Sequence, residues 1–184
     1  MNGRNRSSNR GHVFWLLGLS GAGKSTLAGR LAQELRVGGA PVLVLDGDVL
    51  RSGLCLGLGF SDLERAENLR RAAEVARMGL NSNLLVVASF ITPLAAHRDL
   101  VTGIIGRGDL SFIHVNAPIE VCRARDVKGL YRASSRGDKQ LMTGVDSAFD
   151  FPVQVDLNLL TAQQSLEESV SSLRAFAFNK ISEA

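Results

Sequence analysis

The stretch GLSGAGKST, residues 18–26, fits the pattern G-x-x-x-x-G-K-[ST] and decides the fold of the chain. An apolar segment at 12–17, expected to be a buried strand, precedes it, and an amphipathic helix expected over 24–36 follows it. Glycines let the backbone turn so that several N–H groups face one anion, and the helix adds the positive end of its dipole. In this setting the pattern predicts a loop that binds the phosphates of ATP or GTP together with Mg²⁺.

The side chains of this loop have expected roles. We expect Lys24 to reach the β- and γ-phosphates as a catalytic residue, and the Ser25 hydroxyl to complete a Mg²⁺ shell of water and phosphate oxygens. The residues expected to bind the nucleotide are Gly18, Ser20, Gly21, Ala22, Gly23, Lys24, Ser25 and Thr26.

Strand and helix patterns alternate along the rest of the chain. They predict an α/β protein with a three-layer P-loop NTPase fold: a parallel sheet, helices on both faces and a small mobile lid. The expected strands are 12–17, 42–45, 84–90, 111–115 and 156–160, and the expected helices are 24–36, 62–80, 118–125 and 165–178. Ser61 and Glu64 have the spacing of a capping box at the start of the second helix. The polar segment at about 126–146 is the expected lid.

The composition is that of one domain without a membrane span. The chain has 184 residues, 45% of them hydrophobic, and its apolar runs are too short to cross a bilayer. Residues 1–11 are expected to be a disordered basic tail. The net charge of +3 equals the charge of Arg4, Arg6 and Arg10 in that tail, so the remainder is near neutral and does not favour a nucleic-acid partner.

The cysteines and histidines form no metal or disulfide pattern. Cys55 and Cys122 lie far apart in the sequence, which favours reduced thiols in a cytoplasmic protein. We expect Cys122 to be buried on a short helix and Cys55 to be more exposed. His114 lies in an apolar strand and is expected to be a core histidine rather than a ligand.

An acidic pair follows the second expected strand, in Asp46-Gly47-Asp48. Ligands of doubly wound sheets bind at the carboxyl ends of the strands, so both carboxylates are expected to face the nucleotide. Phosphoryl transfer needs a group that orients the attacking hydroxyl and acidic contacts to the Mg²⁺ shell. We expect Asp48 to be the catalytic base or to orient the hydroxyl group, and Asp46 to assist the metal or the substrate as a second catalytic residue. The alternative is that either aspartate merely caps the next short helix.

A basic and polar cluster follows the acidic pair. Arg51 comes just after it, and Arg65 and Asn68 share one face of the helix expected over 62–80. Arginine forks suit an anionic acceptor, and Phe60 could stack on a base. The alternative is a solvated helix face with paired glutamates, which we expect for Arg71.

Together these residues resemble one family, the adenylylsulfate kinases or APS kinases. The resemblance covers about residues 12–175 and is carried by GLSGAGKST at 18–26, DGDVLR at 46–51, LGFSDLERAENLRR at 58–71, SFITP at 89–93, CRARDVKGLY at 122–131 and TGVD at 143–146. It implies a cytoplasmic P-loop kinase domain over 12–184 that acts in sulfate assimilation. Such a kinase uses ATP and Mg²⁺ to phosphorylate the ribose 3′-hydroxyl of adenylyl sulfate, giving 3′-phosphoadenylyl sulfate and ADP. Family members are often dimeric, so a homodimer is left open.

The resemblance also implies roles for residues outside the loop. The nucleotide would gain Arg125 and Lys128, beside the Mg²⁺ contacts already expected from Ser25 and Asp46. The acceptor would be bound by Asp48, Arg51, Phe60, Arg65, Asn68, Ser89, Ile91, Thr92 and Met142. Thr92 replaces a serine sometimes described as a phosphorylated intermediate. Direct in-line transfer needs no such intermediate, so we expect no covalent role.

Departures from the family pattern lie on the acceptor side and in the lid. Met142 replaces a phenylalanine, Leu141 an asparagine and Ser135 an arginine. Pro93-Leu94-Ala95 lacks an arginine, and Cys55-Leu56-Gly57 replaces a polar stretch. Three interpretations therefore stand: an adenylylsulfate kinase, a related kinase of another small nucleotide such as a cytidine diphosphate derivative, and a nucleotide-binding subunit without catalysis.

Overall fold

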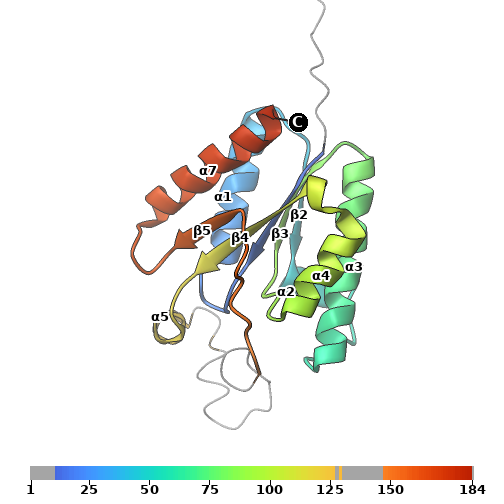
Figure 1. Cartoon of the computed structure of the whole chain (residues 1–184), viewed down its shortest axis with the longest axis vertical. Helices are drawn as coiled ribbons and strands as arrows, with labels where there is room; N and C mark the ends of the chain where they lie inside the picture. The colour runs from blue at the N-terminus through green and yellow to red at the C-terminus, as the bar shows by residue number, and fades with distance from the viewer. Residues whose placement is uncertain (1–10, 127–128, 130–146, 184) are drawn as a thin grey trace, which may run out of the picture.

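The computed structural model describes residues 11–126, 129 and 147–183. A five-stranded parallel sheet forms its middle layer, in the spatial order β2-β3-β1-β4-β5 (Figure 1). The strands are β1 (Val13–Leu17), β2 (Val42–Asp46), β3 (Leu85–Ser89), β4 (Leu110–Asn116) and β5 (Leu157–Leu160). Each expected strand is present with ends shifted by at most one residue, and the predicted fold class is confirmed.

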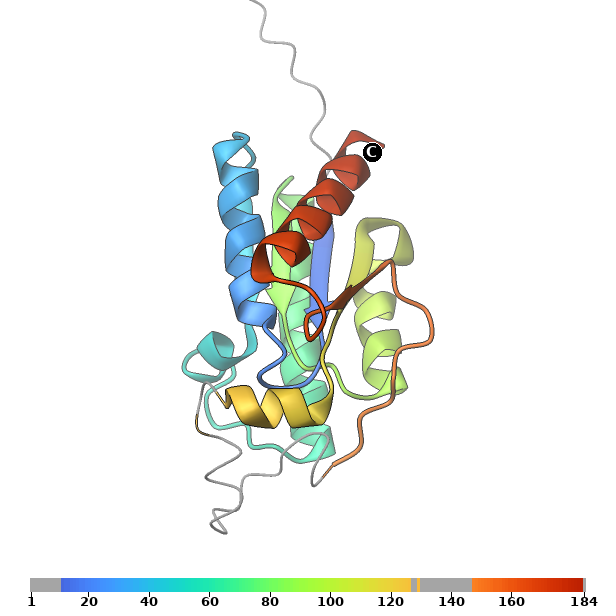
Figure 2. The same ribbon diagram turned by 90° about the vertical axis from the view of Figure 1, so that its left-hand side faces the viewer.

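Helices cover both faces of the sheet. Figure 2 shows α1 (Lys24–Val37) and α7 (Leu166–Ser182) in front of it, and α3 (Asp62–Asn81) and α4 (Ala95–Ile105) lie on the opposite face. Two short helices, α2 (Gly47–Arg51) and α5 (Ile119–Arg125), lie with the turn from β1 to α1 at the carboxyl ends of the strands. A single 3₁₀ turn, η1 (Arg107–Asp109), precedes β4.

The central strand β1 supplies side chains to both layers of the core. All five of its residues are buried, and because successive side chains of a strand point to opposite faces, they alternate between two hydrophobic clusters. Phe14 and Leu16 pack with α1 and α7, whereas Val13, Trp15 and Leu17 pack with α3 and α4. This two-sided burial fixes the strand from which the phosphate loop emerges.

Among the longer helices, α3, α4 and α7 each begin with a side-chain cap, and the caps of α3 and α7 are local in sequence. Ser61 with Glu64 caps α3 as predicted, and Ser165 with Glu168 forms a second capping box on α7. Helix α4 has no counterpart among the expected elements. Its cap residue, Leu94, offers no side-chain hydrogen bond. The cap comes from Asp150, whose Oδ2 accepts a hydrogen bond from the Ala95 amide at 2.9 Å.

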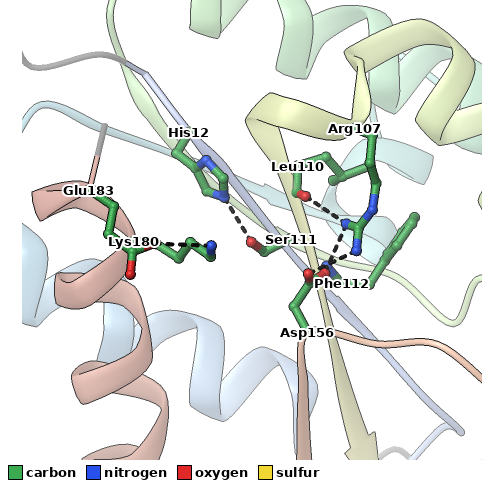
Figure 3. Close-up of polar contacts among 8 residues, drawn as sticks. All are labelled: His12, Arg107, Leu110, Ser111, Phe112, Asp156, Lys180 and Glu183. Atoms are coloured by element: carbon green, nitrogen blue, oxygen red, sulfur yellow. Dashed lines mark hydrogen bonds and ion pairs between the residues drawn. The ribbon is translucent and has the colours of Figure 1, made fainter.

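A carboxylate fixes the start of β5 at the far end of the sheet (Figure 3). Asp156 accepts two hydrogen bonds from Arg107, at 2.9 and 2.8 Å, and one from the Phe112 amide at 2.8 Å. Nearby, His12 Nε2 lies 2.9 Å from Ser111 Oγ. The Asp156 contacts fix the start of β5 beside β4, and so determine which residue follows β5 at the other end of the sheet.

Two expectations about buried side chains have different outcomes. His114 is a core histidine as predicted: it stacks on Phe149 and meets the edge of Phe151, and burial lowers its pKa to about 4. The expectation that Cys55 is exposed is wrong. Both Cys55 and Cys122 are fully buried free thiols. Cys55 is buried because the turn after α2 folds back, where the Cys55 amide donates to the Leu50 carbonyl at 2.8 Å.

Other expectations fall largely outside the part of the chain that the structure describes. Residues 1–10 of the expected tail and nearly all of the expected lid belong here, with Asp126 and Gly129 as the described exceptions. Within the described ranges, none of the helices combines the length and the apolar character that a bilayer crossing requires.

Candidate active site

The phosphate loop joins β1 to α1 with a backbone that excludes side chains at two points. Gly18 has φ of 144°, and a Cβ there would lie 2.3 Å from the Val115 carbonyl oxygen. Gly21 has φ of 81°, and a Cβ there would lie 2.8 Å from the Cys122 carbonyl oxygen. The Gly18 amide also donates to the Ile91 carbonyl at 3.2 Å. The loop is therefore held between the ends of β3 and β4 and the short helix α5.

The N-terminus of α1 differs from those of the other long helices. Gly23 is its cap residue, with φ of 109°, no side-chain cap and no acidic residue in the first turn. Because α3 and α7 both have a serine cap and first-turn acids, α1 alone among these three presents an N-terminus without them. Such an end, with its partial positive charge, suits an anion. Lys24 leans over the loop, where its Nζ donates to the Leu19 carbonyl at 2.7 Å.

The remaining loop residues differ in exposure. Ser20 and Gly21 are half-buried, Ala22 is buried, and Ser25 and Thr26 are exposed in the first turn of α1.

Asp46 connects the loop to the neighbouring strand ends. It closes β2 opposite Ser89 of β3, and its Oδ2 accepts hydrogen bonds from Ser25 Oγ at 2.6 Å and from Ser89 Oγ at 2.7 Å. Its Oδ1 accepts from the Asp48 amide at 3.0 Å, which makes it the cap of α2. The capping role and the contact with the loop therefore coexist, on different oxygens of one carboxylate.

The donors gathered around Asp46 suit Mg²⁺. Hydroxyl and carboxylate oxygens are the protein ligands that this ion prefers, and it usually keeps several waters and phosphate oxygens besides. Among the described residues, no group of three or more His, Cys, Asp or Glu side chains could hold a metal ion alone. Ser25 and Asp46 are thus suited to an ion that arrives with phosphates rather than to a site built wholly from protein.

Asp48 lies in the first turn of α2 and is exposed. It is near enough to Arg51, in the last turn of the same helix, to act on its guanidinium: burial lowers the pKa of Arg51, and the charge of Asp48 opposes that change. A carboxylate beside a cation at the carboxyl end of a strand can orient a hydroxyl group and accept its proton.

Two arginines grip the turn that carries Phe60. Arg51 Nη1 donates to the carbonyls of Leu58 and Gly59 at 3.0 and 2.8 Å, and its guanidinium carbon lies 4.5 Å from the centroid of the Phe60 ring. Arg65, from α3, donates through Nε to the Phe60 carbonyl at 2.7 Å. The predicted members of the acceptor side therefore come together from α2, the turn and α3.

The electrostatics of this cluster favour an anion. Burial lowers the pKa of both arginines; the charge of Asp62 opposes this at Arg65, where the charge of Arg51 lowers the pKa further, and Asp48 and Glu64 oppose it at Arg51. Nearby carboxylates offset only part of the cost of burying two like charges, so an anionic ligand beside them is favourable. One turn further along α3, Asn68 is 5% exposed, and its Oδ1 has no hydrogen-bond partner among the described residues.

The loop after β3 carries the last of the described acceptor residues. Ser89 is buried and bound to Asp46, and Ile91 is half-buried and holds the Gly18 amide through its carbonyl. Thr92 is 1% exposed, has φ of 46°, and accepts a hydrogen bond from Trp15 Nε1 at 2.8 Å. Thr92 is thus buried with its hydroxyl held by an indole N–H, and the absence of a covalent role stays a prediction.

Arg125, at the end of α5, contacts the protein backbone. Its Nη1 donates to the Ala22 carbonyl at 3.3 Å, and its Nη2 donates to the Thr161 carbonyl at 2.5 Å. Sequence reasoning missed Thr161, because a threonine just beyond a short strand carries no recognisable pattern. Lys128 and Met142, predicted on the nucleotide and acceptor sides, lie outside the described residues.

Comparisons with known proteins agree on one family. The model of the family described as adenylylsulphate kinase matches residues 10–160. An adenylyl-sulfate kinase of Aeromonas hydrophila is 45% identical over 161 residues, which are 88% of this chain and 82% of that protein. One of Paraburkholderia xenovorans is 45% identical over 169 residues, covering 92% of this chain and 94% of that protein.

Solved structures give the same picture. The APS kinase of Mycobacterium tuberculosis in complex with AMPPNP and APS superposes with a TM-score of 0.87 at 38% identity, over 91% of this chain and 98% of that one. A hexameric APS kinase from Thiobacillus denitrificans superposes with a TM-score of 0.70 at 27% identity, over 94% of this chain and 29% of that one.

Proposed function

Because the chain belongs to the adenylylsulphate kinase family, we propose that it transfers the γ-phosphoryl group of ATP to the ribose 3′-hydroxyl of adenylyl sulfate. The products are ADP and 3′-phosphoadenylyl sulfate. The M. tuberculosis relative in complex with AMPPNP and APS, at 38% identity over most of both chains, supports both substrates.

On the nucleotide side, the proposal draws on the loop at 18–26 and its neighbours. The amides that follow Gly18 and the N-terminus of α1 would hold the phosphates, with Lys24 at the β- and γ-phosphates. Ser25 and Asp46 would hold Mg²⁺, which, when bound with ATP, neutralises charge that develops on the transferring group. The 2.6 Å contact between these two side chains supports that pairing.

On the acceptor side, one observation carries the proposal: Arg51 and Arg65 are partly buried like charges that converge on Phe60. This arrangement suits a molecule that is both anionic and aromatic, as a sulfated adenosine phosphate is. Asn68, with its buried Oδ1, adds a polar group on the same helix face. Asp48 would orient the 3′-hydroxyl and accept its proton, with the phosphoryl group passing directly in line.

The experiment is a coupled assay of ADP formation with purified full-length chain, ATP and Mg²⁺, with and without adenylyl sulfate. ADP release that depends on adenylyl sulfate, with a product that carries a new 3′-phosphate, is expected. A folded sample that binds ATP but shows no turnover at micromolar adenylyl sulfate would contradict this acceptor.

A second acceptor is worth testing because this chain has Leu94-Ala95 after Pro93, where the family pattern includes an arginine. A thermal-shift panel of nucleotides, including cytidine diphosphate derivatives, in the presence of ADP and Mg²⁺ separates the candidates, since a true ligand stabilises the folded state by mass action. Stabilisation by adenylyl sulfate alone is the expected result.

The assembly and the location of the protein are also proposals. We propose that the protein is cytoplasmic, which its two free, buried thiols support. We also propose that it forms a homodimer, as members of the family often do. The hexameric relative shows that larger assemblies occur among similar chains. Light scattering coupled to size-exclusion chromatography distinguishes a monomer, a dimer and a hexamer directly.

A further inference from the structure

We propose that Thr161 is a positioning residue for ATP, which acts by fixing the peptide between Ala22 and Gly23 in the phosphate loop. This inference rests on the proposed nucleotide site but not on the identity of the acceptor. Thr161 directly follows β5, so it stands at the same end of the sheet as the loop, although 139 positions separate it from Ala22.

The hydroxyl of Thr161 is directed at the loop backbone. Oγ1 donates to the Ala22 carbonyl at 2.9 Å, whereas the Asn116 carbonyl is farther away, at 3.4 Å. A hydroxyl has one proton, so the shorter contact is the main hydrogen bond. Arg125 Nη1 reaches the same Ala22 oxygen at 3.3 Å, which gives this carbonyl two donors from outside the loop.

Thr161 is itself held in place. Its amide donates to the Asn116 carbonyl at 3.0 Å, which continues the pairing of β4 and β5, and its carbonyl accepts from Arg125 Nη2 at 2.5 Å. The register of β5 is fixed at its other end by Asp156 (Figure 3). The hydroxyl group is therefore carried by a strand end whose backbone is held by hydrogen bonds.

The consequence for the nucleotide follows from peptide geometry. In a planar trans peptide the carbonyl oxygen and the next amide N–H point in opposite directions. Two donors that hold the Ala22 oxygen on the side of β5 thereby turn the Gly23 N–H away from β5. Ala22 is fully buried, but Gly23 has φ of 109° and nothing within 4 Å of a Cβ position, so no packing on the side chain's side of Gly23 restricts the rotation of this peptide. Glycine backbones are permissive, and an external hydrogen bond is what selects one orientation.

Other backbone contacts of the loop come from different sides. The Gly18 amide is held by Ile91 at the opposite flank, and the Ala22 amide donates to the Leu19 carbonyl within the loop at 3.2 Å. Loss of the Thr161 hydroxyl would leave the Ala22 oxygen with the longer Arg125 contact. We therefore expect a change in nucleotide affinity with little change in the fold.

The test uses Thr161→Val, which keeps the shape of the side chain but removes the hydroxyl, and Thr161→Ser, which keeps the hydroxyl. Affinity for the non-hydrolysable analogue AMPPNP with Mg²⁺ is measured by calorimetry on the full chain. We expect Thr161→Val to raise the Kd about tenfold, the effect of one lost hydrogen bond, and Thr161→Ser to stay within about threefold of the parent. The KM for ATP should rise in parallel, with the KM for adenylyl sulfate unchanged.

The matched control is Thr102→Val, because the Thr102 hydroxyl also donates to a backbone carbonyl, that of Arg98 in α4, at 2.8 Å. Its nucleotide affinity should not change. An unchanged Kd in Thr161→Val, or an equal loss in Thr161→Ser, overturns the proposal, as does an equal rise of both KM values. If the valine variant does not fold, Thr161→Ala answers the same question. Binding of AMPPNP needs no acceptor, so a wrong acceptor would leave this result intact.

Discussion

Asp46 Oδ2 lies 2.6 Å from Ser25 Oγ, across the gap between the end of β2 and the first turn of α1. The other oxygen of the same carboxylate caps α2 through the Asp48 amide. One side chain thus serves a structural purpose and faces the proposed metal position, and a substitution can separate the two.

We expect Asp46→Asn to keep the cap and lose the metal. Asparagine caps helices about as well as aspartate, so the melting temperature should change by no more than about 2 °C. An uncharged amide is a poor Mg²⁺ ligand, so the Mg²⁺ concentration for half-maximal activity should rise at least about tenfold. Glu167→Gln, which neutralises an acid in the first turn of α7, is the control. An unaltered Mg²⁺ dependence would remove Asp46 from the metal site.

Asp48→Asn tests the proposed base. Loss of a positioned proton acceptor commonly lowers rates by about 10²–10⁴-fold, so kcat should fall by at least about 10² while the Kd for AMPPNP stays the same. Asp99→Asn, on the exposed side of α4, should retain full activity. Steady-state kinetics together with calorimetry separate the two effects, and full activity in Asp48→Asn would exclude this residue as the base.

Arg51→Lys tests the acceptor cluster. Lysine cannot hold the carbonyls of Leu58 and Gly59 with a planar fork and at the same time stack on Phe60, so the KM for adenylyl sulfate should rise about tenfold or more. The KM for ATP should stay within about twofold. The control is Arg70→Lys on the exposed face of α3, where the guanidinium pairs with Glu67. An equal rise in both KM values would mean that Arg51 supports the whole site rather than the acceptor.

Local sequence signals predicted much of this architecture. The glycine pattern at 18–26 and the apolar strands gave the sheet and the loop, because burial on both faces imposes continuous apolar runs. Ser61 with Glu64 predicted the start of α3 to the residue, since a capping box lies within one turn.

Contacts between distant residues could not be predicted in this way. Helix α4 has no local cap, and Asp150, 55 positions away in the sequence, supplies one. Cys55 is buried by a turn that Arg51 helps to hold. Thr161 reaches the loop only because β5 lies beside β4. Each of these depends on tertiary pairing, which a single sequence does not encode in any short pattern.

Gly18→Ala should strongly destabilise the fold. A Cβ would lie 2.3 Å from the Val115 carbonyl oxygen, and φ of 144° is rarely adopted by residues with a side chain. We expect a loss of about 3 kcal/mol, or a melting temperature lower by about 6–12 °C. Gly103→Ala is the matched control: it lies in α4 with nothing within 4 Å of its Cβ position, and should gain up to about 1 kcal/mol. Equal melting temperatures for the two variants would contradict the geometry of the loop.

His114 should make the fold sensitive to mild acid. Burial against Phe149 and Phe151 lowers its pKa from the ordinary 6.5 to about 4, so the unfolded chain takes up a proton more readily than the folded one. The stability that this histidine contributes is present above pH 6.5 and is lost as the pH falls from there towards 4. Between pH 7 and pH 5 the loss amounts to about 2 kcal/mol.

His114→Phe removes the titrating group and keeps an aromatic ring in the same cluster. In urea unfolding at pH 7 and pH 5, the variant should lose about 2 kcal/mol less stability than the parent, because its ring cannot be protonated in either state. Phe149→Leu is the companion variant: it weakens the packing but keeps the imidazole, so its stability should be lower at both pH values and still fall with acid. The carboxylates and His97, whose pKa is also lowered by burial, change the stability of parent and variant equally with pH, so their effects cancel in the comparison. If His114→Phe and the parent lose the same stability between these pH values, the imidazole is protonated as easily in the fold as outside it, and the packing around β4 is looser than described.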